Sequence, residues 1–401
     1  MKLVSNTKHC LIFFLLIIFG CAATDPIKKV SKSDQKKADT YFLQGNDFLM
    51  KNQKDDAIIN YTQAIDLNPA HQDAYFNRGV ANKSAGRNDN AIADFSKVIE
   101  INPGASDAYL NRGIIYTQKG MLDEATSDLS KSIELNPVNA QVYYSRGMIY
   151  YNKNQYDLAI LDFNKTIELN PGLANAYNSR GYTYFKKGQF DLSIADFNKL
   201  LEINPSYDKA YFRRGVTYFG MQNYESAISD LTKALEIDPG SANAFLIRGQ
   251  AYLAKLDYDS AMADFTKALE IDPKYDRAYY SRGTVYSSKQ NVESAVSDFT
   301  KALEISPTYS PAFVYRGDYY NKLNQLGSAI QDYTKAIDLD PKNGKIYFYR
   351  SVVYWKNKEY QKAWEDAEKA KGLGETIDSS FLDILARDLR KKEGKGSPPK
   401  R

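Results

Sequence analysis

The chain contains few of the residues that form disulfides, metal sites or catalytic centres. Its 401 residues include two cysteines and two histidines. Cys10 lies within an apolar segment near the N-terminus and Cys21 follows that segment, so a disulfide framework is excluded for the rest of the chain. His71 stands alone, and the sequence has no cluster of metal ligands and no glycine-rich phosphate loop. We therefore expect a protein that is not an enzyme and that uses no cofactor and no metal.

Long apolar runs are also scarce, and the one that is present lies at the N-terminus. Residues 11–19 are all apolar, with Lys2 and Lys8 before them and small residues at 20–23. A bilayer span needs about 20 apolar residues, so this run is too short to cross a membrane. A cationic start, an apolar core and a small-residue junction together predict a secretory signal over residues 1–20.

The end of that signal resembles the lipobox of bacterial lipoproteins in residues 18–21, which read Ile-Phe-Gly-Cys. The resemblance implies that Cys21 is acylated and becomes the first residue of a lipid-anchored protein. Phe19 departs from the pattern, because a small residue is commoner there. The alternative is an ordinary signal cleaved near Ala23, which would leave a soluble secreted protein. We expect residues 21–37, which are mostly polar, to be the lipidated N-terminus and a tether.

The prolines mark an internal repeat. Nine of the thirteen stand 34 residues apart, and a fixed period in this range is typical of a stacked-repeat protein. The nine are Pro69, Pro103, Pro137, Pro171, Pro205, Pro239, Pro273, Pro307 and Pro341.

Other positions of the repeat recur in the same register. With the proline as position 32, position 8 is glycine in nine repeats and Ser351 in the tenth, and position 24 is a large apolar residue except for Ala367. Apolar residues recur at helical spacing twice in each repeat; Ala159 and Phe163, for example, share one face of a second helix. The small residues predict close approach of two helices. Because one helix pair cannot bury both apolar stripes, the repeats are expected to stack.

This pattern resembles the tetratricopeptide repeat, in register over residues 38–377. The resemblance implies an all-α fold, a right-handed α-solenoid of ten helix pairs followed by a C-terminal capping helix. We expect the capping helix at 378–391 and a basic, disordered tail at 392–401. The ten repeats are 38–71, 72–105, 106–139, 140–173, 174–207, 208–241, 242–275, 276–309, 310–343 and 344–377.

Arginine at position 7 and aspartate at position 23 occur together. Nine repeats have both, and the first has neither, with Gln44 and Asn60 in their place. This joint loss predicts structural ion pairs within repeats, in preference to a row of arginines that binds an anionic ligand. A pair between neighbouring repeats, or between the aspartate and the lysine at position 26, is the competing interpretation. The predicted pairs include Arg112 with Asp128, Arg146 with Asp162, and Arg180 with Asp196.

The tetratricopeptide resemblance also implies that positions 2, 5, 9, 12 and 13 of the first helices line a groove. Many of these positions are aromatic or aliphatic, which suits an extended peptide or a partner helix. Burial of position 5 under adjacent helices is the alternative. The predicted groove residues are Tyr144, Met148, Tyr151, Tyr182, Phe185, Lys209, Phe212, Arg213, Val216, Phe219, Leu246 and Leu253.

These features predict a non-catalytic scaffold tethered to a membrane. Resemblance to bacterial tetratricopeptide lipoproteins implies an adaptor that binds other, unidentified proteins of the cell envelope, on the periplasmic or surface face of the outer membrane. Export argues against a nucleic-acid partner. Two alternatives remain open: a wall-glycan-binding protein that uses the tyrosines and the basic tail, and a soluble secreted binding protein.

Overall fold

The computed structural model describes residues 30–392. The predicted signal, Cys21, most of the tether and residues 393–401 of the tail lie outside the described residues. Within residues 30–392 every regular element is an α-helix, and there is no strand. The prediction of an all-α chain of ten helix pairs with one further C-terminal helix is confirmed.

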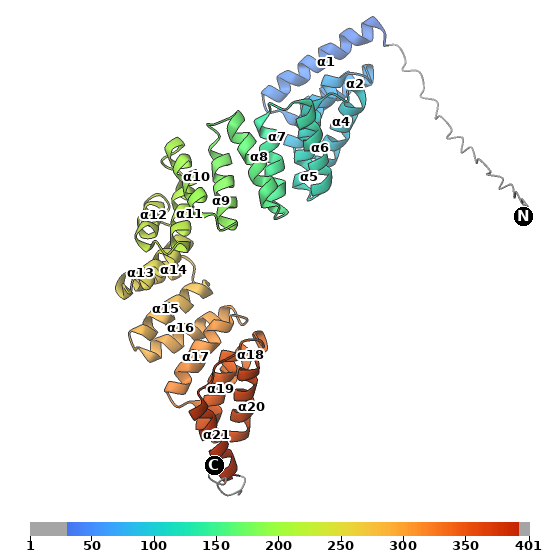
Figure 1. The fold of residues 1–401 in the computed structure, drawn as a ribbon. Coiled ribbons are helices and arrows are strands. Elements are labelled where there is room, and N and C mark those ends of the chain that lie inside the picture. Colours follow the sequence, from blue (N-terminus) through green and yellow to red (C-terminus); the bar gives the residue numbers. More distant parts are fainter. Residues whose placement is uncertain (1–29, 393–401) are drawn as a thin grey trace, which may run out of the picture. The chain divides into compact units, whose positions relative to one another are not determined.

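The helices follow one another in pairs along the chain (Figure 1). The first helices of the pairs are α1 (Lys32–Met50), α3 (Gln72–Ser84), α5 (Ser106–Gln118), α7 (Ala140–Asn152), α9 (Ala174–Lys186), α11 (Asp208–Gly220), α13 (Ala242–Ala254), α15 (Asp276–Ser288), α17 (Ser310–Lys322) and α19 (Gly344–Lys356). The second helices are α2 (Lys54–Leu67), α4 (Asn88–Ile101), α6 (Leu122–Leu135), α8 (Tyr156–Leu169), α10 (Phe190–Ile203), α12 (Tyr224–Ile237), α14 (Tyr258–Ile271), α16 (Val292–Ile305), α18 (Leu326–Leu339) and α20 (Tyr360–Gly372). The last helix is α21 (Ser379–Lys392).

The chain divides into two compact bodies. The N-terminal body is Met1–Val142 and the C-terminal body is Tyr143–Arg401, so the division falls within the first turn of α7. In the N-terminal body α3 packs against α4 of its own repeat and against α2 and α5 of its neighbours. In the C-terminal body α13 likewise packs against α14, α12 and α15. Within each body, neighbouring repeats therefore share a core, as expected for stacked helix pairs.

The glycine at position 8 lies against the large residue at position 24. In the seventh repeat Gly249 on α13 faces Phe265 on α14, whose ring is fully buried. The tenth repeat differs at both positions. Ala367 leaves space for Ser351, whose hydroxyl donates a 2.7 Å hydrogen bond to the carbonyl of Ala363. Glycine is also kept where position 24 is leucine, as in Gly113 against Leu129, so a large side chain at position 24, aromatic or aliphatic, is what requires glycine at position 8.

The turn between the two helices of a repeat has the same left-handed conformation throughout. Position 15 has a positive φ in all ten repeats. It is occupied by Asn52, Gly86, Gly120, Asn154, Gly188, Gln222, Leu256, Gln290, Asn324 and Lys358. The next N–H closes the turn by donating to the carbonyl of position 11, for example Asp257 to Tyr252 at 2.9 Å. This helix C-cap satisfies carbonyls that the end of a helix leaves open.

The turn between repeats depends on the residue before the proline. Asp272 ends α14 with an extended backbone, as a residue before proline requires. Its carboxylate accepts a 2.9 Å hydrogen bond from the N–H of Lys274, which closes a turn around Pro273. An aspartate or asparagine followed by proline is therefore a local sequence signal for the turn that ends one repeat and begins the next.

The predicted tether is wrong at its C-terminal end. Helix α1 begins at Lys32, and not at residue 38. Ser31 is the N-cap, and its hydroxyl oxygen accepts a 3.0 Å hydrogen bond from the N–H of Asp34. Gln35 accepts a further 2.9 Å hydrogen bond from the side chain of Asn68. The polar composition of residues 32–37 belongs to a capped, solvent-facing helical turn, because lysine and glutamine are good helix formers.

Helix α21 covers the apolar end of the tenth repeat. Leu385 is fully buried against this repeat, and the ring of Phe381 meets that of Trp355 at a centroid distance of 6.1 Å. The indole N–H of Trp355 donates a 3.1 Å hydrogen bond to Asp388. The helix spans Ser379–Lys392, close to the 378–391 expected from the sequence.

Candidate functional site

The predicted arginine–aspartate pairs lie within single repeats. Arg112 donates to the two carboxylate oxygens of Asp128 through Nε at 2.7 Å and through Nη2 at 2.8 Å. The carboxylate is buried, and donation to it raises the pKa of Arg112. The same two hydrogen bonds, at 2.6–2.9 Å, join Arg146 to Asp162 and Arg180 to Asp196.

Arg112 and Arg180 also contact the preceding repeat and two aromatic rings each. In the N-terminal body, Nη1 of Arg112 donates to the hydroxyl of Ser96 at 2.9 Å. In the C-terminal body, the rings of Tyr177 and Tyr184 lie 5.7 and 5.9 Å from the Arg180 guanidinium. Such an arginine donates hydrogen bonds to two neighbouring side chains and has aromatic rings beside its guanidinium group. The row of arginines therefore has a structural role.

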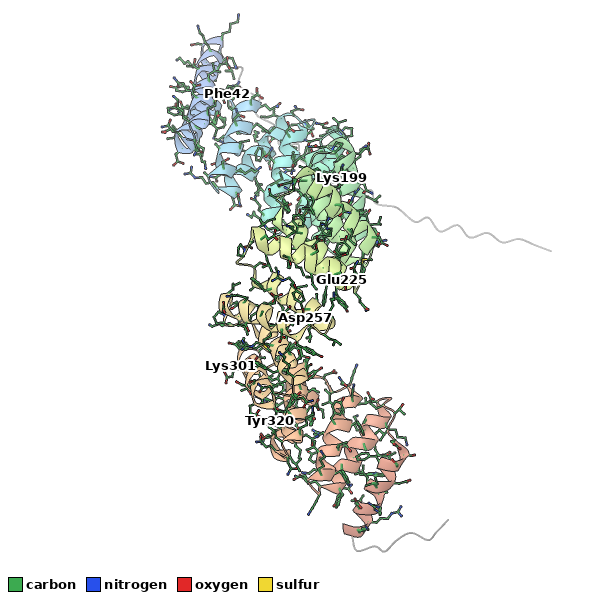
Figure 2. All side chains as sticks on the ribbon, turned by 90° about the vertical axis from the view of Figure 1, so that its left-hand side faces the viewer. Phe42, Lys199, Glu225, Asp257, Lys301 and Tyr320 are labelled. Atoms are coloured by element: carbon green, nitrogen blue, oxygen red, sulfur yellow. The ribbon has the colours of Figure 1, made fainter. Side chains whose placement is uncertain are left out.

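The lysine at position 26 does not pair with the aspartate at position 23. It pairs instead with a glutamate three residues further along the exposed face of the second helix. Lys199 lies 2.7 Å from Glu202 and Lys301 lies 2.6 Å from Glu304. The two lysines are labelled in Figure 2. Exposed pairs of this kind contribute little to stability.

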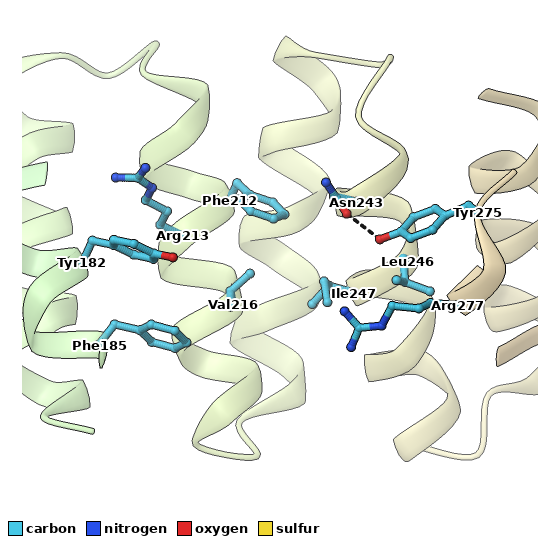
Figure 3. A pocket seen from close by; sticks show the side chains of 10 residues that line it. All are labelled: Tyr182, Phe185, Phe212, Arg213, Val216, Asn243, Leu246, Ile247, Tyr275 and Arg277. Atoms are coloured by element: carbon cyan, nitrogen blue, oxygen red, sulfur yellow. Dashed lines mark hydrogen bonds between the residues drawn. The ribbon is translucent and has the colours of Figure 1, made fainter. Parts of the chain in front are cut away.

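A pocket in the C-terminal body brings many of the predicted groove residues together. Its volume is about 300 Å³. Side chains from α9, α11, α13 and the start of α15 form its walls (Figure 3). The lining residues are Tyr182, Phe185, Phe212, Arg213, Val216, Asn243, Leu246, Ile247, Tyr275 and Arg277.

Half of the predicted groove residues line this pocket. They are Tyr182, Phe185, Phe212, Arg213, Val216 and Leu246. Leu246 is 1% exposed, whereas Phe212 is only half-buried. The residue at position 5 is therefore buried by adjacent helices in the seventh repeat and open to the pocket in the sixth. Its exposure depends on the side chains of the neighbouring repeats.

The other predicted groove residues lie outside the lining. Tyr151 on α7 borders it, with its ring 6.0 Å from that of Tyr182. Phe219 packs beside Tyr224 on α12, at a centroid distance of 5.8 Å. Tyr144, Met148, Lys209 and Leu253 are also not part of the lining. The pocket thus spans the fifth to eighth repeats, whereas the predicted groove residues begin with Tyr144 in the fourth repeat and end with Leu253 in the seventh.

The pocket contains two guanidinium groups and no carboxylate in its lining. Arg213 lies over the ring of Tyr182 at 4.6 Å, and its Nη1 donates a 2.7 Å hydrogen bond to Asn178. Arg277 on the opposite wall is exposed (Figure 3). Within residues 30–392, neither arginine has an ion pair like that of Arg214 with Asp230. Their positive charge is therefore not neutralised by a contacting carboxylate.

A tyrosine hydroxyl connects the two helices at the far wall. Tyr275, the N-cap residue of α15, donates a hydrogen bond to the side chain of Asn243 at the start of α13 (Figure 3). Burial raises the pKa of Tyr275, although the charge of Arg277 opposes the shift. The hydroxyl is therefore a donor at neutral pH and holds Asn243 at the rim.

Four lining residues were missed in the sequence: Asn243, Ile247, Tyr275 and Arg277. Asn243 and Arg277 occupy position 2, one of the groove positions that the family resemblance implies, so their signal was present. Ile247 is at position 6 and Tyr275 at position 34, in the loop between repeats. Neither position belongs to the expected set: position 6 is on the first helix but is not one of the expected groove positions, and position 34 lies outside the first helices.

Within residues 30–392, no group of three or more His, Cys, Asp or Glu side chains is arranged to hold a metal ion. In the same range, no helix combines the length and the apolar character that crossing a bilayer requires.

Comparison with known families gives matches along most of the chain. Models described as "Tetratricopeptide repeat" match residues 42–106, 83–129, 140–173, 208–241 and 276–309. A model described as "TPR repeat" matches residues 113–154, 181–222, 249–290 and 317–358. No curated protein matches the chain.

Solved structures of other repeat proteins are also similar. YrrB, described as a TPR protein with an unusual peptide-binding site, is 25% identical over 46% of this chain and 95% of its own, with a TM-score of 0.41. A tetratricopeptide repeat protein from Parabacteroides merdae is 23% identical over 62% of this chain and 99% of its own, with a TM-score of 0.46. Yeast Tom70 is 16% identical over 90% of this chain and 98% of its own, with a TM-score of 0.42.

The helix pairs, the 34-residue register and the family matches agree from the first repeat to the tenth. The chain belongs to the tetratricopeptide repeat family, whose fold is a scaffold typical of protein–protein interaction.

Proposed function

We propose that this protein is a non-catalytic adaptor that binds an extended segment of a partner protein in the pocket of the fifth to eighth repeats. The observation that carries the proposal is the combination in one pocket of an apolar floor and two arginines without carboxylate partners. The protein is tethered to a membrane of the bacterial envelope through a lipid on Cys21.

The apolar part of the pocket fits one large side chain of the partner. Phe185, Phe212, Val216 and Ile247 contribute aromatic and aliphatic surface around the buried Leu246. Burial of apolar area contributes about 25 cal/mol per Å², so a leucine or phenylalanine side chain supplies most of the affinity. A volume of about 300 Å³ suits a single anchor residue with its neighbours.

The charged part of the pocket selects the residues beside that anchor. Arg213 and Arg277 stand on opposite walls, and the contacts that hold Arg213 in place are to an amide oxygen and to a ring. A guanidinium pairs well with a carboxylate through two parallel hydrogen bonds. We therefore expect a segment with acidic residues on both sides of its apolar anchor.

The tether follows from the lipobox-like residues 18–21. A lipid on Cys21 and the polar residues before Ser31 would hold the repeats near a membrane. Labelled palmitate fed to cells that produce the wild type or Cys21→Ala tests this part. Label in the wild type alone supports the anchor, and equal absence from both proteins rejects it.

The pocket is tested by photocrosslinking in living cells. A photoreactive residue at Ile247 reports the pocket, and one at Ile237, which is 44% exposed at the end of α12, is the matched control. We expect a discrete adduct at position 247 that is weaker at position 237 and that disappears with Phe212→Ala. Adducts of equal yield at both positions would place the partner elsewhere. Binding of the purified protein to cell-wall glycan, with no protein adduct, would favour the glycan-binding alternative.

A further inference from the structure

The tyrosine at position 11 is part of the structural arginine network. Eight of the nine repeats that have the arginine at position 7 have tyrosine at position 11. These are Tyr116, Tyr150, Tyr184, Tyr218, Tyr252, Tyr286, Tyr320 and Tyr354. In six of these repeats the tyrosine ring lies over the guanidinium, with distances of 5.6 to 6.0 Å from the arginine Cζ to the ring centroid. The first repeat, which has Gln44 and no arginine, has Phe48 at this position. The tyrosine therefore accompanies the arginine.

The second repeat is the exception. Arg78 keeps its ion pair, with Nη2 2.7 Å from Asp94, and it keeps the ring of Tyr75 at 5.4 Å on one face. Position 11, however, is Asn82. The side-chain amide of Asn82 donates a 2.9 Å hydrogen bond to Asp94, so it supports the carboxylate but supplies no ring. Arg78 thus lacks the second aromatic cover that the repeat pattern provides elsewhere.

A cavity of about 290 Å³ borders Arg78 and Asn82. It lies between α2 and α4 and is lined by Ile58, Thr62, Arg78, Asn82, Arg87, Asn90, Ala93 and Asp94. Nε and Nη2 of Arg78 donate to Asp94, and Nη1 donates to Thr62 at 3.0 Å, so three of its five N–H groups are used within the protein. The face of the guanidinium is open to a ring in the place of the missing tyrosine.

Asn82, which borders the cavity, also has a buried polar atom without a partner. Asn82 is 3% exposed, and its Oδ1 accepts no hydrogen bond within the described part of the chain. A buried acceptor of this kind favours a ligand that brings a donor. The rim includes Arg87, whose ion pair with Asp55 is solvent-exposed, so this side chain can move without loss of buried contacts.

We propose that this cavity is a receptor for a tyrosine side chain of another protein. The ring stacks on the open face of Arg78 in the place that the repeat's own tyrosine occupies elsewhere, and the hydroxyl brings the donor that Asn82 lacks. Residues 1–29 and 393–401 contain no tyrosine, so the parts of this chain outside the structure do not supply it. The site is in the N-terminal body, whereas the proposed peptide pocket is in the C-terminal body, and each can fail without the other.

The test uses the full chain and two probes, N-acetyl-tyrosinamide and N-acetyl-phenylalaninamide, in NMR titrations that follow the side-chain amide of Asn82. We expect saturable binding of the tyrosine probe and at least tenfold weaker binding of the phenylalanine probe. In Asn82→Tyr the chain fills its own cavity, so binding of the tyrosine probe, now followed through the side-chain amide of Asn90, falls at least tenfold. Equal binding of both probes, or undiminished binding by Asn82→Tyr, overturns the proposal.

Two further variants keep the test decisive if Asn82→Tyr folds poorly. Ala93→Trp, at an exposed position of the rim, blocks the mouth of the cavity and is expected to abolish binding while the core is untouched. Tyr116→Ala removes the ring over Arg112 and opens a similar vacancy in the third repeat, but without the acceptor that Asn82 supplies. We expect this variant to bind a second equivalent of the tyrosine probe, and to bind the phenylalanine probe equally well at this second site. If the wild type does not bind the probe and Tyr116→Ala binds one equivalent, the proposal is overturned. The missing ring would then create a tyrosine site in the third repeat, whereas Asn82 closes the corresponding site in the second.

Discussion

Arg248 and Asp264 form a two-point ion pair in which Nε and Nη2 of the arginine donate to the two carboxylate oxygens at 2.8 and 2.7 Å. The arginine side chain is 16% exposed and the aspartate side chain 6%. Arg248→Ala leaves the carboxylate buried and unpaired, so we expect the free energy of unfolding to fall by about 3 kcal/mol. Arg248→Lys should be intermediate, since an ammonium does not reproduce the planar two-point contact. Urea unfolding measures both; loss of peptide binding with unchanged stability would contradict the structural role.

Close contact between Gly249 and Phe265 gives a second prediction. A methyl group on Gly249 would lie 2.7 Å from Cε1 of the phenylalanine ring, so the buried ring or the helices must shift in Gly249→Ala. Overpacking of a core costs about 1–3 kcal/mol. Gly327, near the start of α18, has no atom within 4 Å of the same methyl position, so Gly327→Ala is the control. It should stabilise by up to about 1 kcal/mol, because alanine favours the helix. Thermal midpoints that move in the same direction would contradict this explanation.

Leu256 is a bulky residue at a left-handed turn position, with a φ of 63° and 68% exposure. Glycine adopts this conformation without the steric cost of about 1–2 kcal/mol that other residues bear. We expect Leu256→Gly to raise the thermal midpoint of the C-terminal body. The reciprocal change, Gly188→Ala, places a side chain at a φ of 72° and should lower it. Both are measured by circular dichroism; a lower midpoint for Leu256→Gly would indicate that the leucine makes a contact that outweighs the strain.

Phe212 and Phe219 lie on the same helix, and alanine variants of the two distinguish an effect on partner binding from an effect on folding. Phe212 lines the peptide pocket, whereas Phe219 does not and instead packs beside Tyr224. We expect Phe212→Ala to weaken the photocrosslinked partner at least tenfold and Phe219→Ala to leave its affinity almost unchanged. Both should retain the helical signal of the wild type. Equal loss in both variants would mean that the aromatic row acts as a whole and that the pocket is not the principal site.

Asp318 gives a prediction about pH. Burial raises the pKa of this carboxyl, although the hydroxyl of Tyr333 donates to it and Lys322 and Lys345 lie nearby. A carboxyl whose pKa is higher in the folded state stabilises the fold below its unfolded pKa of about 3.9, and this contribution is lost as pH rises through the folded value. Asp318→Asn removes that dependence and still accepts the tyrosine hydrogen bond.

We therefore expect Asp318→Asn to have the higher thermal midpoint at pH 7 and no advantage below about pH 4. Asp338→Asn, at a carboxylate that is 62% exposed, is the control and should change the free energy of unfolding by less than about 0.5 kcal/mol. A difference between wild type and Asp318→Asn that is constant from pH 4 to pH 7 would show that ionisation of Asp318 does not affect the fold.

The contacts that could be predicted from the sequence are those between two residues that are separated by the same number of positions in each repeat. Gly249 and Phe265 are 16 residues apart, as are Arg112 and Asp128, and the same separation recurs in other repeats. A contact that recurs at one spacing leaves a pattern of joint presence and joint loss, which is why the missing pair in the first repeat was informative. The fold follows from such contacts because each repeat packs chiefly on itself and on its nearest neighbours.

The pocket was only partly predictable because four successive repeats contribute to it. Tyr275 belongs to a loop and Arg277 to the repeat after it, and neither has a counterpart in every repeat with the same role. Asn82 was missed because it is a single exception, in one repeat, to the tyrosine at position 11. The exception becomes informative only when the structure shows that this tyrosine lies over the arginine in other repeats. The start of α1 was predicted wrongly because polar composition alone does not distinguish a tether from an exposed helical turn.

Within each of the two bodies, a third hydrogen bond from the structural arginine to the preceding repeat gives the repeats a direction. Nη1 of Arg78 donates to Thr62 of the preceding repeat, and Nη1 of Arg316 donates to Thr300 in the same way. An internal duplication or deletion of 34 residues would preserve this bond, since a hydroxyl or amide at position 25 would still precede the arginine. Deletion of the first repeat would not, because Arg78 would lose Thr62. Gene rearrangements can therefore lengthen or shorten this protein in its interior with this bond intact, whereas loss of the first repeat leaves Arg78 without its third partner.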